Sequence, residues 1–146
     1  MTGRTAVTRT RVRFGETDAA GIVFYPTFFV WFDLGTTALL RSAATESLRL
    51  GDGHPRWPLP IVESGARFSA PLYFDDPIAI RSSVVEIGTR SLRVEHVILR
   101  GETEVARGFE VRVFIAVGEG GAIASEPLPD ELRASLSAAI TVDDRD

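Results

Sequence analysis

A single apolar helical pattern, in a chain whose other segments alternate like strands, is the feature that most constrains the fold. From residue 26 to about residue 49 the chain is rich in helix-forming residues, and large apolar side chains recur at steps of three and four. They are Phe28, Trp31, Phe32, Leu34, Ala38 and Leu39. Pro26 suits the first turn of such a helix, because a residue there needs no backbone N–H. A helix with so much apolar surface has to be covered by other elements.

The segments around this helix have the composition of β-strands. β-Branched and aromatic residues alternate with polar ones, or fill short runs bounded by turn residues, over residues 7–14, 59–70, 77–87, 91–101 and 104–117. The short turns between the later strands predict antiparallel hairpins. A short helix is expected over residues 129–139 and a frayed end over residues 143–146. The sequence therefore predicts one α+β domain, residues 1–146, in which an antiparallel sheet of five or more strands wraps around one long central helix.

Composition and charge exclude several classes of site and partner. The chain has no cysteine, and its two histidines, His54 and His96, are 42 positions apart without metal-ligand spacing around either, so no metal or cofactor is expected. The net charge of −4 argues against nucleic acid as a partner. The chain contains neither a long apolar run nor a signal-like N-terminus, so we expect a soluble, cytoplasmic protein without a membrane segment.

Asp18 is the candidate catalytic residue. It lies in a loop of small and polar residues directly before the apolar helix, where helix-terminal N–H groups can support a carboxylate beside a buried cleft. An aspartate at this place is more often a helix cap than a catalyst. Its position alone leaves both roles open.

Residues 13–26, RFGETDAAGIVFYP, resemble the signature of the 4-hydroxybenzoyl-coenzyme A thioesterase family of hotdog-fold enzymes: an aspartate, two small residues, Gly-Ile-Val, an aromatic pair and then the helix. Further similar positions extend the resemblance over roughly residues 10–115. It implies the hotdog fold and hydrolysis of an acyl-CoA. By the same resemblance, Asp18 is the nucleophile or general base, the main-chain N–H of Tyr25 polarises the thioester carbonyl, and Gly21 lets the backbone approach the ligand.

The resemblance also implies an acyl pocket shared between two subunits. Its candidate residues here are Asp33, Pro60, Ile61 and Val62, although an ordinary helix surface and a core strand explain them equally well. Glu63 ranks well below Asp18 as a catalytic carboxylate. All 16 basic residues are arginines, which suit phosphate groups.

The basic cluster that binds the nucleotide in the family falls on the turn at residues 88–91, where Arg90 is the one remaining cation. Either other arginines compensate, namely Arg56, Arg81 or Arg93, or the protein holds the nucleotide loosely or prefers an acyl carrier protein. Phe28 and Phe29 replace polar or phenolic positions of the hydroxybenzoyl enzyme, and an apolar lining favours a benzoyl or other unsubstituted acyl group.

The leading hypothesis is hydrolysis of an aromatic (benzoyl or hydroxybenzoyl) or medium acyl-CoA by a homodimer or homotetramer, with coenzyme A as part of the substrate. Two alternatives stay open. A hydroxyacyl dehydratase on the same fold needs a histidine near the helix, yet neither His54 nor His96 lies at the helix start. A non-catalytic acyl-binding subunit would keep the pocket without using Asp18.

Overall fold

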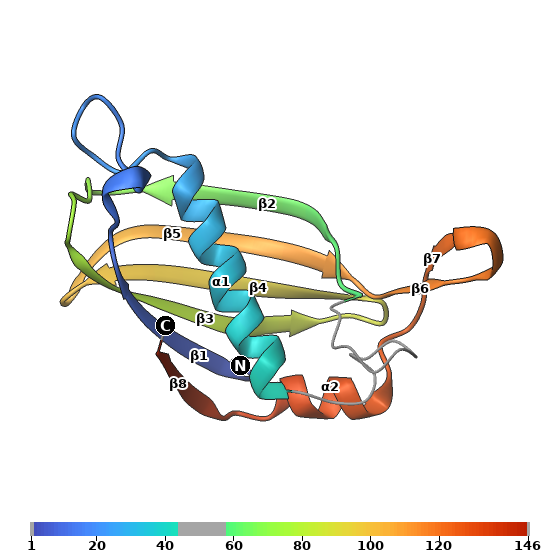
Figure 1. Ribbon diagram of the computed structural model, residues 1–146. Coiled ribbons are helices and arrows are strands. Elements are labelled where there is room, and N and C mark those ends of the chain that lie inside the picture. Colours follow the sequence, from blue (N-terminus) through green and yellow to red (C-terminus); the bar gives the residue numbers. More distant parts are fainter. Residues whose placement is uncertain (1, 44–57, 146) are drawn as a thin grey trace.

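The computed structural model describes residues 2–43 and 58–145. In these residues a long helix follows the first strand and precedes a run of strands, as the sequence predicts (Figure 1). The strands and helices are β1 (Thr5–Arg11), α1 (Pro26–Ala43), β2 (Ile61–Phe68), β3 (Pro77–Ile87), β4 (Ser91–Arg100), β5 (Thr103–Val113), β6 (Ile115–Val117), β7 (Ile123–Ser125), α2 (Asp130–Ser137) and β8 (Thr141–Arg145). Short 3₁₀ turns occur at Phe14–Glu16 and Glu119–Gly121.

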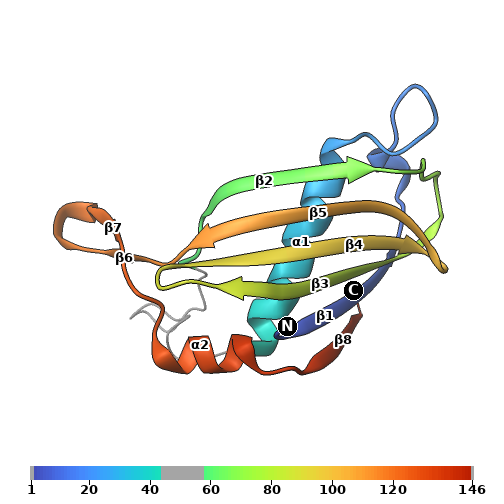
Figure 2. The same cartoon turned by 180° about the vertical axis from the view of Figure 1, so that it is seen from behind.

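Six strands form one sheet in the order β2-β5-β4-β3-β1-β8. Neighbouring strands run antiparallel, except that β8 lies parallel to β1. The sheet curves around α1, which crosses one face of it, and the opposite face is open in the view from behind (Figures 1 and 2). This arrangement confirms the predicted α+β architecture and the hotdog fold.

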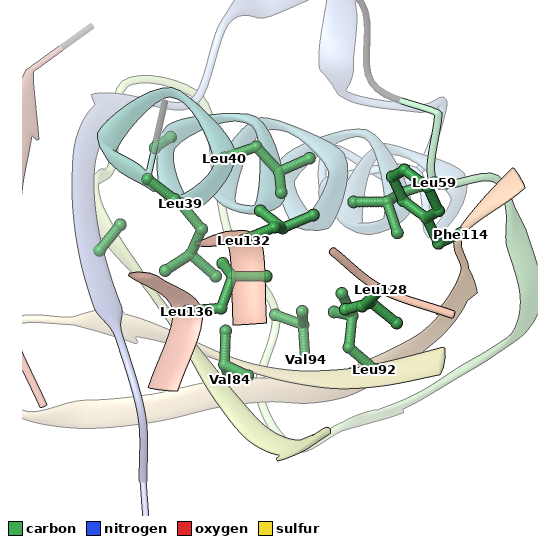
Figure 3. Packing of buried hydrophobic residues seen from close by; sticks show 13 residues of the cluster. Leu39, Leu40, Leu59, Val84, Leu92, Val94, Phe114, Leu128, Leu132 and Leu136 are labelled. Carbon is green, nitrogen blue, oxygen red and sulfur yellow. The ribbon is translucent and has the colours of Figure 1, made fainter. Parts of the chain in front are cut away.

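The apolar face of α1 is buried against the sheet. Its buried residues extend over the whole helix, from Phe28 and Trp31 in the first turns to Leu39, Leu40 and Ala43 in the last. At the far end, α2 adds Leu132 and Leu136 to the same core, as Figure 3 shows. Each of these large side chains contributes about 2 kcal/mol through burial, so the helix is fixed mainly by its contacts with the sheet.

Two glycines allow the helix to approach the sheet closely. A Cβ at Gly35 would lie 2.0 Å from Ser82 Oγ on β3, and a Cβ at Gly108 would lie 2.3 Å from the ring of Phe32. Larger side chains at these two positions would push the helix and the sheet apart.

The structure corrects several predicted boundaries. The first strand is β1, Thr5–Arg11, followed by a 3₁₀ turn, and the last predicted strand is divided at Phe114 into β5 and β6. The predicted frayed end was wrong, because residues Thr141–Arg145 form β8, which pairs with β1 and satisfies the backbone groups on the facing sides of the two strands. The helix predicted to residue 49 is described to Ala43, and residues 44–49 lie outside the described residues.

The short helix predicted over residues 129–139 is confirmed as α2. No helix in the described part of the chain is long and apolar enough to cross a membrane. The extent of the domain stays a prediction.

Candidate active site

The loop that carries Asp18 is held by its own hydrogen bonds. The Asp18 N–H donates to the Ile22 carbonyl at 2.9 Å, and the Gly21 N–H donates to the Asp18 carbonyl at 2.9 Å. Gly21 has a φ of 84°, which favours glycine, so its first role is to close this turn. The Asp18 carboxylate accepts a hydrogen bond from the Ala20 N–H at 2.8 Å and is exposed in the single chain. Asp18 is therefore a solvated carboxylate on a defined loop and does not cap α1.

Tyr25 is the last residue before α1. Its carbonyl accepts a hydrogen bond from the Phe28 N–H at 3.1 Å, while the Phe24 N–H is held by the Glu16 carbonyl at 2.9 Å. The N–H of Tyr25 itself has no hydrogen-bond partner among the residues that the structure describes. A free N–H at a helix start, where the helix dipole adds positive potential, suits a developing oxyanion.

An apolar cleft of about 410 Å³ opens beside this helix start. The Val23 N–H donates to the Leu72 carbonyl at 2.9 Å and so joins the loop before α1 to the segment after β2. The rings of Phe28 and Phe68 meet edge to face across the cleft, with centroids 4.9 Å apart. The cleft is lined by Ile22, Val23, Tyr25, Phe28, Phe68, Ser69, Ala70, Pro71 and Leu72. A backbone donor and an apolar cleft thus adjoin the carboxylate loop.

Of the two phenylalanines behind the hypothesis of an apolar acyl lining, only one lies at the cleft. Phe28 lines the cleft, although it is also buried in the core. Phe29 is half-buried, with its ring 5.6 Å from that of Phe32 and its side chain packed against the core. Because Phe29 contacts the core instead of the cleft, it gives no basis for the choice of acyl group.

The predicted pocket residues Asp33, Ile61 and Val62 lie together at another place, beside the start of β2. Arg112 on β5 pairs with Ile61 in the sheet and donates to Asp33 Oδ1 at 3.1 Å. Ile61 and Val62 are 46% and 59% exposed, large fractions for aliphatic side chains. Pro60, also exposed, offers its carbonyl to the Val113 N–H at 3.1 Å. Since β2 is an edge strand, these apolar side chains lie open on the free edge of the sheet.

The turn between β3 and β4, which contains Arg90, lies at the opposite end of the sheet from the loop between β1 and α1, which contains Asp18 (Figure 1). β3 alone has 11 residues and spans about 35 Å, so Arg90 and Asp18 of one chain cannot hold the same thioester. The Arg90 guanidinium donates to the Ser125 carbonyl at 2.5 Å. Of the alternative arginines, Arg81 is exposed, Arg93 lies over the ring of Phe109 at 4.1 Å, and Arg56 lies outside the described residues.

His96 is completely buried on β4, where its ring stacks on Phe32 at a centroid distance of 4.8 Å. It lies against the middle of α1 and not at its start, and His54 falls outside the described residues. His96 Nε2 is 2.7 Å from Glu110 Oε1. A sealed histidine of this kind has no access to substrate, which argues against a dehydratase site at His96.

Glu110 is the most strongly perturbed carboxylate of this region. Burial raises the pKa of Glu110, but the hydrogen bond and charge of His96, the charge of Arg112 and the hydrogen bond from Thr36 outweigh burial and lower the pKa to about 2. Glu110 is therefore ionised at neutral pH. Among the described residues no group of three or more histidine, aspartate or glutamate side chains is placed to hold a metal ion.

The single chain thus brings the candidate residues into two separate groups. Tyr25 lines the cleft together with Ile22 and Val23, which follow Asp18 and Gly21 in the same loop. Asp33, Pro60, Ile61 and Val62 lie at the start of β2. Sequence reasoning missed Glu110 and Arg112. The sequence did contain a signal: Gly108, Glu110 and Arg112 are every second residue of a strand, so all three face the same side of the sheet. Neighbouring strands bury apolar residues on that side.

Comparison with known proteins identifies the family of the chain. A family model described as the thioesterase-like superfamily matches residues 12–136. The chain is 28% identical to a 4-hydroxybenzoyl-CoA thioesterase of Pseudomonas sp. (strain CBS-3), over 86% of this chain and 93% of that protein. It is 27% identical to a 1,4-dihydroxy-2-naphthoyl-CoA hydrolase of Synechococcus sp. (strain WH7803), over 89% and 87%.

Solved structures give the same result. A gentisyl-coenzyme A thioesterase is 35% identical and superposes with a TM-score of 0.72, over 89% of this chain and 98% of that one. A mutant 4-hydroxybenzoyl-CoA thioesterase in complex with 4-hydroxybenzoyl-CoA shares the fold, with a TM-score of 0.78 at 23% identity over 92% and 100%. With a family model that covers most of its length, a free N–H at the start of its long helix and a carboxylate loop beside an apolar cleft, the chain belongs to the thioesterase-like superfamily, as a thioester hydrolase of the hotdog fold.

Proposed function

We propose that this protein hydrolyses an aromatic or medium acyl-CoA to the free acid and coenzyme A, with Asp18 as nucleophile or general base. The observation that carries the proposal is the unpaired Tyr25 N–H at the start of α1, next to the Asp18 loop and the apolar cleft. These are the parts that a thioester hydrolase needs: a reagent, a donor for the carbonyl oxygen and a place for the acyl group.

The chemistry follows from these groups. In the nucleophilic route, an Asp18 oxygen attacks the thioester carbonyl, the C–S bond breaks, coenzyme A leaves as a thiolate that takes up a proton, and water hydrolyses the resulting anhydride. In the general-base route, Asp18 takes a proton from the water that attacks. In both routes the carbonyl oxygen becomes negative and the Tyr25 N–H stabilises it, an effect of about a hundredfold in rate or more. No cofactor is required for either route.

A two-fold dimer through β2 would unite the two groups of candidate residues. β2 is an edge strand with exposed apolar side chains, and an edge of this kind favours pairing with a second copy. If two β2 strands pair antiparallel, the start of one strand, with Ile61 and Val62, adjoins the end of the other, with Phe68 and the cleft. Asp33 of one subunit then approaches the site that contains Asp18 of the other.

The same dimer gives Arg90 a role that it cannot have in a single chain. The two-fold axis brings Arg90 of the second subunit to the end of the sheet that carries Asp18 of the first, where it can meet the phosphates of coenzyme A. Two dimers could associate further into a tetramer. A cytoplasmic location stays a prediction.

The comparisons favour an aromatic acyl group that carries hydroxyl groups. The similar proteins are named for hydroxybenzoyl, dihydroxynaphthoyl and gentisyl thioesters of coenzyme A. Phe28 supplies an apolar wall, and we propose that Asp33 from the other subunit accepts a hydrogen bond from a hydroxyl of the acyl group. This favours hydroxybenzoyl over benzoyl as the acyl group.

The catalytic role is tested by Asp18→Asn, assayed by thiol release from benzoyl-CoA and 4-hydroxybenzoyl-CoA. We expect kcat to fall by about a thousandfold without loss of stability, since Asp18 is exposed. Asp130→Asn, an exposed aspartate on α2, is the control and should keep full activity. Retention of turnover within about tenfold by Asp18→Asn, only about 1.4 kcal/mol of barrier, would exclude Asp18 as the reagent.

The dimer is tested by a matched pair of valine substitutions. Val62 on β2 and Val117 on β6 are both 59% exposed, so Val62→Arg and Val117→Arg add the same charge at equal exposure. We expect Val62→Arg to give monomers in sedimentation velocity and to lose turnover, and Val117→Arg to do neither. If both variants stay associated and active, pairing through β2 is wrong.

A further inference from the structure

A chain of polar residues runs through the core between the sheet and α1. Ser82 Oγ shares a hydrogen bond of 2.7 Å with His96 Nδ1, and His96 Nε2 lies 2.7 Å from Glu110 Oε1. Thr36 on α1 donates to the same carboxylate oxygen at 2.7 Å. Since ionised Glu110 can only accept hydrogen bonds, His96 Nε2 is the donor to it. The four residues are at most 1% exposed.

The order serine, histidine, carboxylate is that of a hydrolase triad, but here all three side chains are buried away from solvent. Ser82 lies directly under Gly35 of the helix, where even a Cβ on that glycine would come within 2.0 Å of its hydroxyl. A substrate carbonyl cannot reach such a hydroxyl. Any effect of these hydrogen bonds on a substrate therefore has to pass through a residue at one end of the chain of hydrogen bonds.

That residue is Arg112, which extends from the buried cluster to the surface. Its Nε donates to Glu110 Oε2 at 2.9 Å and its Nη1 to the Leu59 carbonyl at 3.0 Å. Its Nη2 donates both to Glu110 and to Asp33 Oδ1, the latter at 3.1 Å. Four of the five donors of the guanidinium are thus engaged, so its plane is fixed.

Asp33 differs from the other residues of this hydrogen-bonded chain because its side chain is exposed to solvent. Its side chain is 64% exposed, whereas that of Arg112 is 9% exposed. In the single chain an ion pair with so exposed a partner adds little stability, and Arg112 already has Glu110 as its buried counter-charge. Stability alone does not explain the contact of Arg112 with Asp33. The contact does fix one oxygen of Asp33, and the other oxygen has no partner among the described residues.

We propose that Arg112, held by the buried Ser82–His96–Glu110 chain, is a positioning residue that fixes the Asp33 carboxylate and thereby sets the preference for acyl groups that carry a hydroxyl. This inference rests on the proposed function, in which Asp33 contacts the acyl group. A carboxylate fixed in place by a rigid partner discriminates better than a mobile one, because a missing hydroxyl leaves its free oxygen unpaired.

The test compares kcat/KM for 4-hydroxybenzoyl-CoA with kcat/KM for benzoyl-CoA. Arg112→Lys keeps the charge next to Glu110 but cannot span Glu110, Leu59 and Asp33 with one planar fork. We expect the ratio of the two kcat/KM values to fall about tenfold or more, with benzoyl-CoA turnover within about threefold of the wild type. A purely structural defect would lower both values together. Arg107→Lys is the control, an exposed arginine on the same strand whose partner is Glu104.

Substitutions at Asp33 complete the test. Asp33→Asn should lower the ratio as much as Arg112→Lys, and the double variant should lower it no further, because both act on one contact. Asp33→Glu leaves the buried cluster intact and keeps the charge but displaces the carboxylate. Its ratio should also fall about tenfold, which tests, even if Arg112→Lys does not fold, whether the position of the carboxylate sets the preference.

Two results overturn the inference while leaving the proposed function intact. One is a folded Arg112→Lys or Asp33→Glu enzyme whose ratio stays within about twofold of the wild type. The other is a double variant whose loss equals the product of the two single losses. A wild-type protein that hydrolyses neither thioester overturns the choice of a hydroxybenzoyl or benzoyl acyl group, and this inference with it; one that hydrolyses no acyl-CoA overturns the proposed function as a whole.

Discussion

The ionised Glu110 in the core makes the stability of this protein depend on pH in a defined way. Its pKa is lowered from the ordinary 4.5 to about 2 in the folded protein. A lowered pKa means that the folded state prefers the ionised form, so the stabilisation is fully present above pH 4.5 and is lost as the pH falls towards 2. At 1.36 kcal/mol per pKa unit, this difference amounts to about 3 kcal/mol.

The perturbation that isolates this effect is Glu110→Gln, which mimics the protonated side chain at every pH. At pH 7 the variant should be about 3 kcal/mol less stable than the wild type, because it leaves Arg112 without its buried counter-charge. The difference should shrink from about pH 5 downwards and nearly vanish at about pH 2. Glu102→Gln, in the exposed turn between β4 and β5, is the control and should follow the wild-type curve.

The assay is urea unfolding followed by circular dichroism from pH 2 to pH 7, at one protein concentration so that association contributes equally. Parallel curves for the wild type and Glu110→Gln would refute the reasoning, since the two proteins differ only in this ionisation. Equal stability at pH 7 would refute it as well.

Three further predictions concern packing. Gly108→Ala should cost about 2 kcal/mol in urea unfolding, because its Cβ would lie 2.3 Å from the Phe32 ring. Phe28→Ala, at a buried position between core and cleft, should cost about 3 to 5 kcal/mol, and Phe68→Ala, 47% exposed, less than half as much by the same measurement. Deletion of residues 141–146 removes the parallel strand beside β1 and should lower the thermal midpoint by several degrees, measured by calorimetry.

Each of these predictions has a control and a contrary result. Gly118→Ala meets its nearest atom at 3.7 Å and should be neutral, so an equal loss at both glycines would contradict the packing argument. Equal losses at Phe28 and Phe68 would show that burial does not decide their contributions. Asp143→Asn removes only the exposed ion pair with Arg9 and should cost less than about 1 kcal/mol. If it matches the deletion, side-chain charge and not strand pairing holds β8.

Local patterns predicted the elements that depend on neighbouring residues. The apolar spacing of residues 28–39 and Pro26 before it gave α1, and Gly21, Asp18 and the residues around them gave the loop and the helix start. β8 was missed because its residues, TVDDR, are polar and pair in parallel with a strand more than 130 positions away. Nothing in the local sequence indicates such a partner.

The candidate site also has a part that depends on neighbouring residues and a part that depends on distant ones. Asp18, Gly21 and Tyr25 lie close together in sequence, so their relation could be predicted from a short segment, whereas the contact of Arg112 with Asp33 joins two elements 79 residues apart. Position in the sheet also decided that Arg90 and Asp18 of one chain lie at opposite ends.

The sequence by itself determined the fold class, the one long helix and the carboxylate before it, because hydrophobic periodicity and turn chemistry act over a few residues. Only the tertiary structure decided that a buried histidine and glutamate hold Arg112 against Asp33, and that the candidate pocket residues Ile61 and Val62 lie on a free sheet edge. The physical reason is that burial and charge pairing depend on which faces of distant strands meet around the helix, and no local pattern records that meeting.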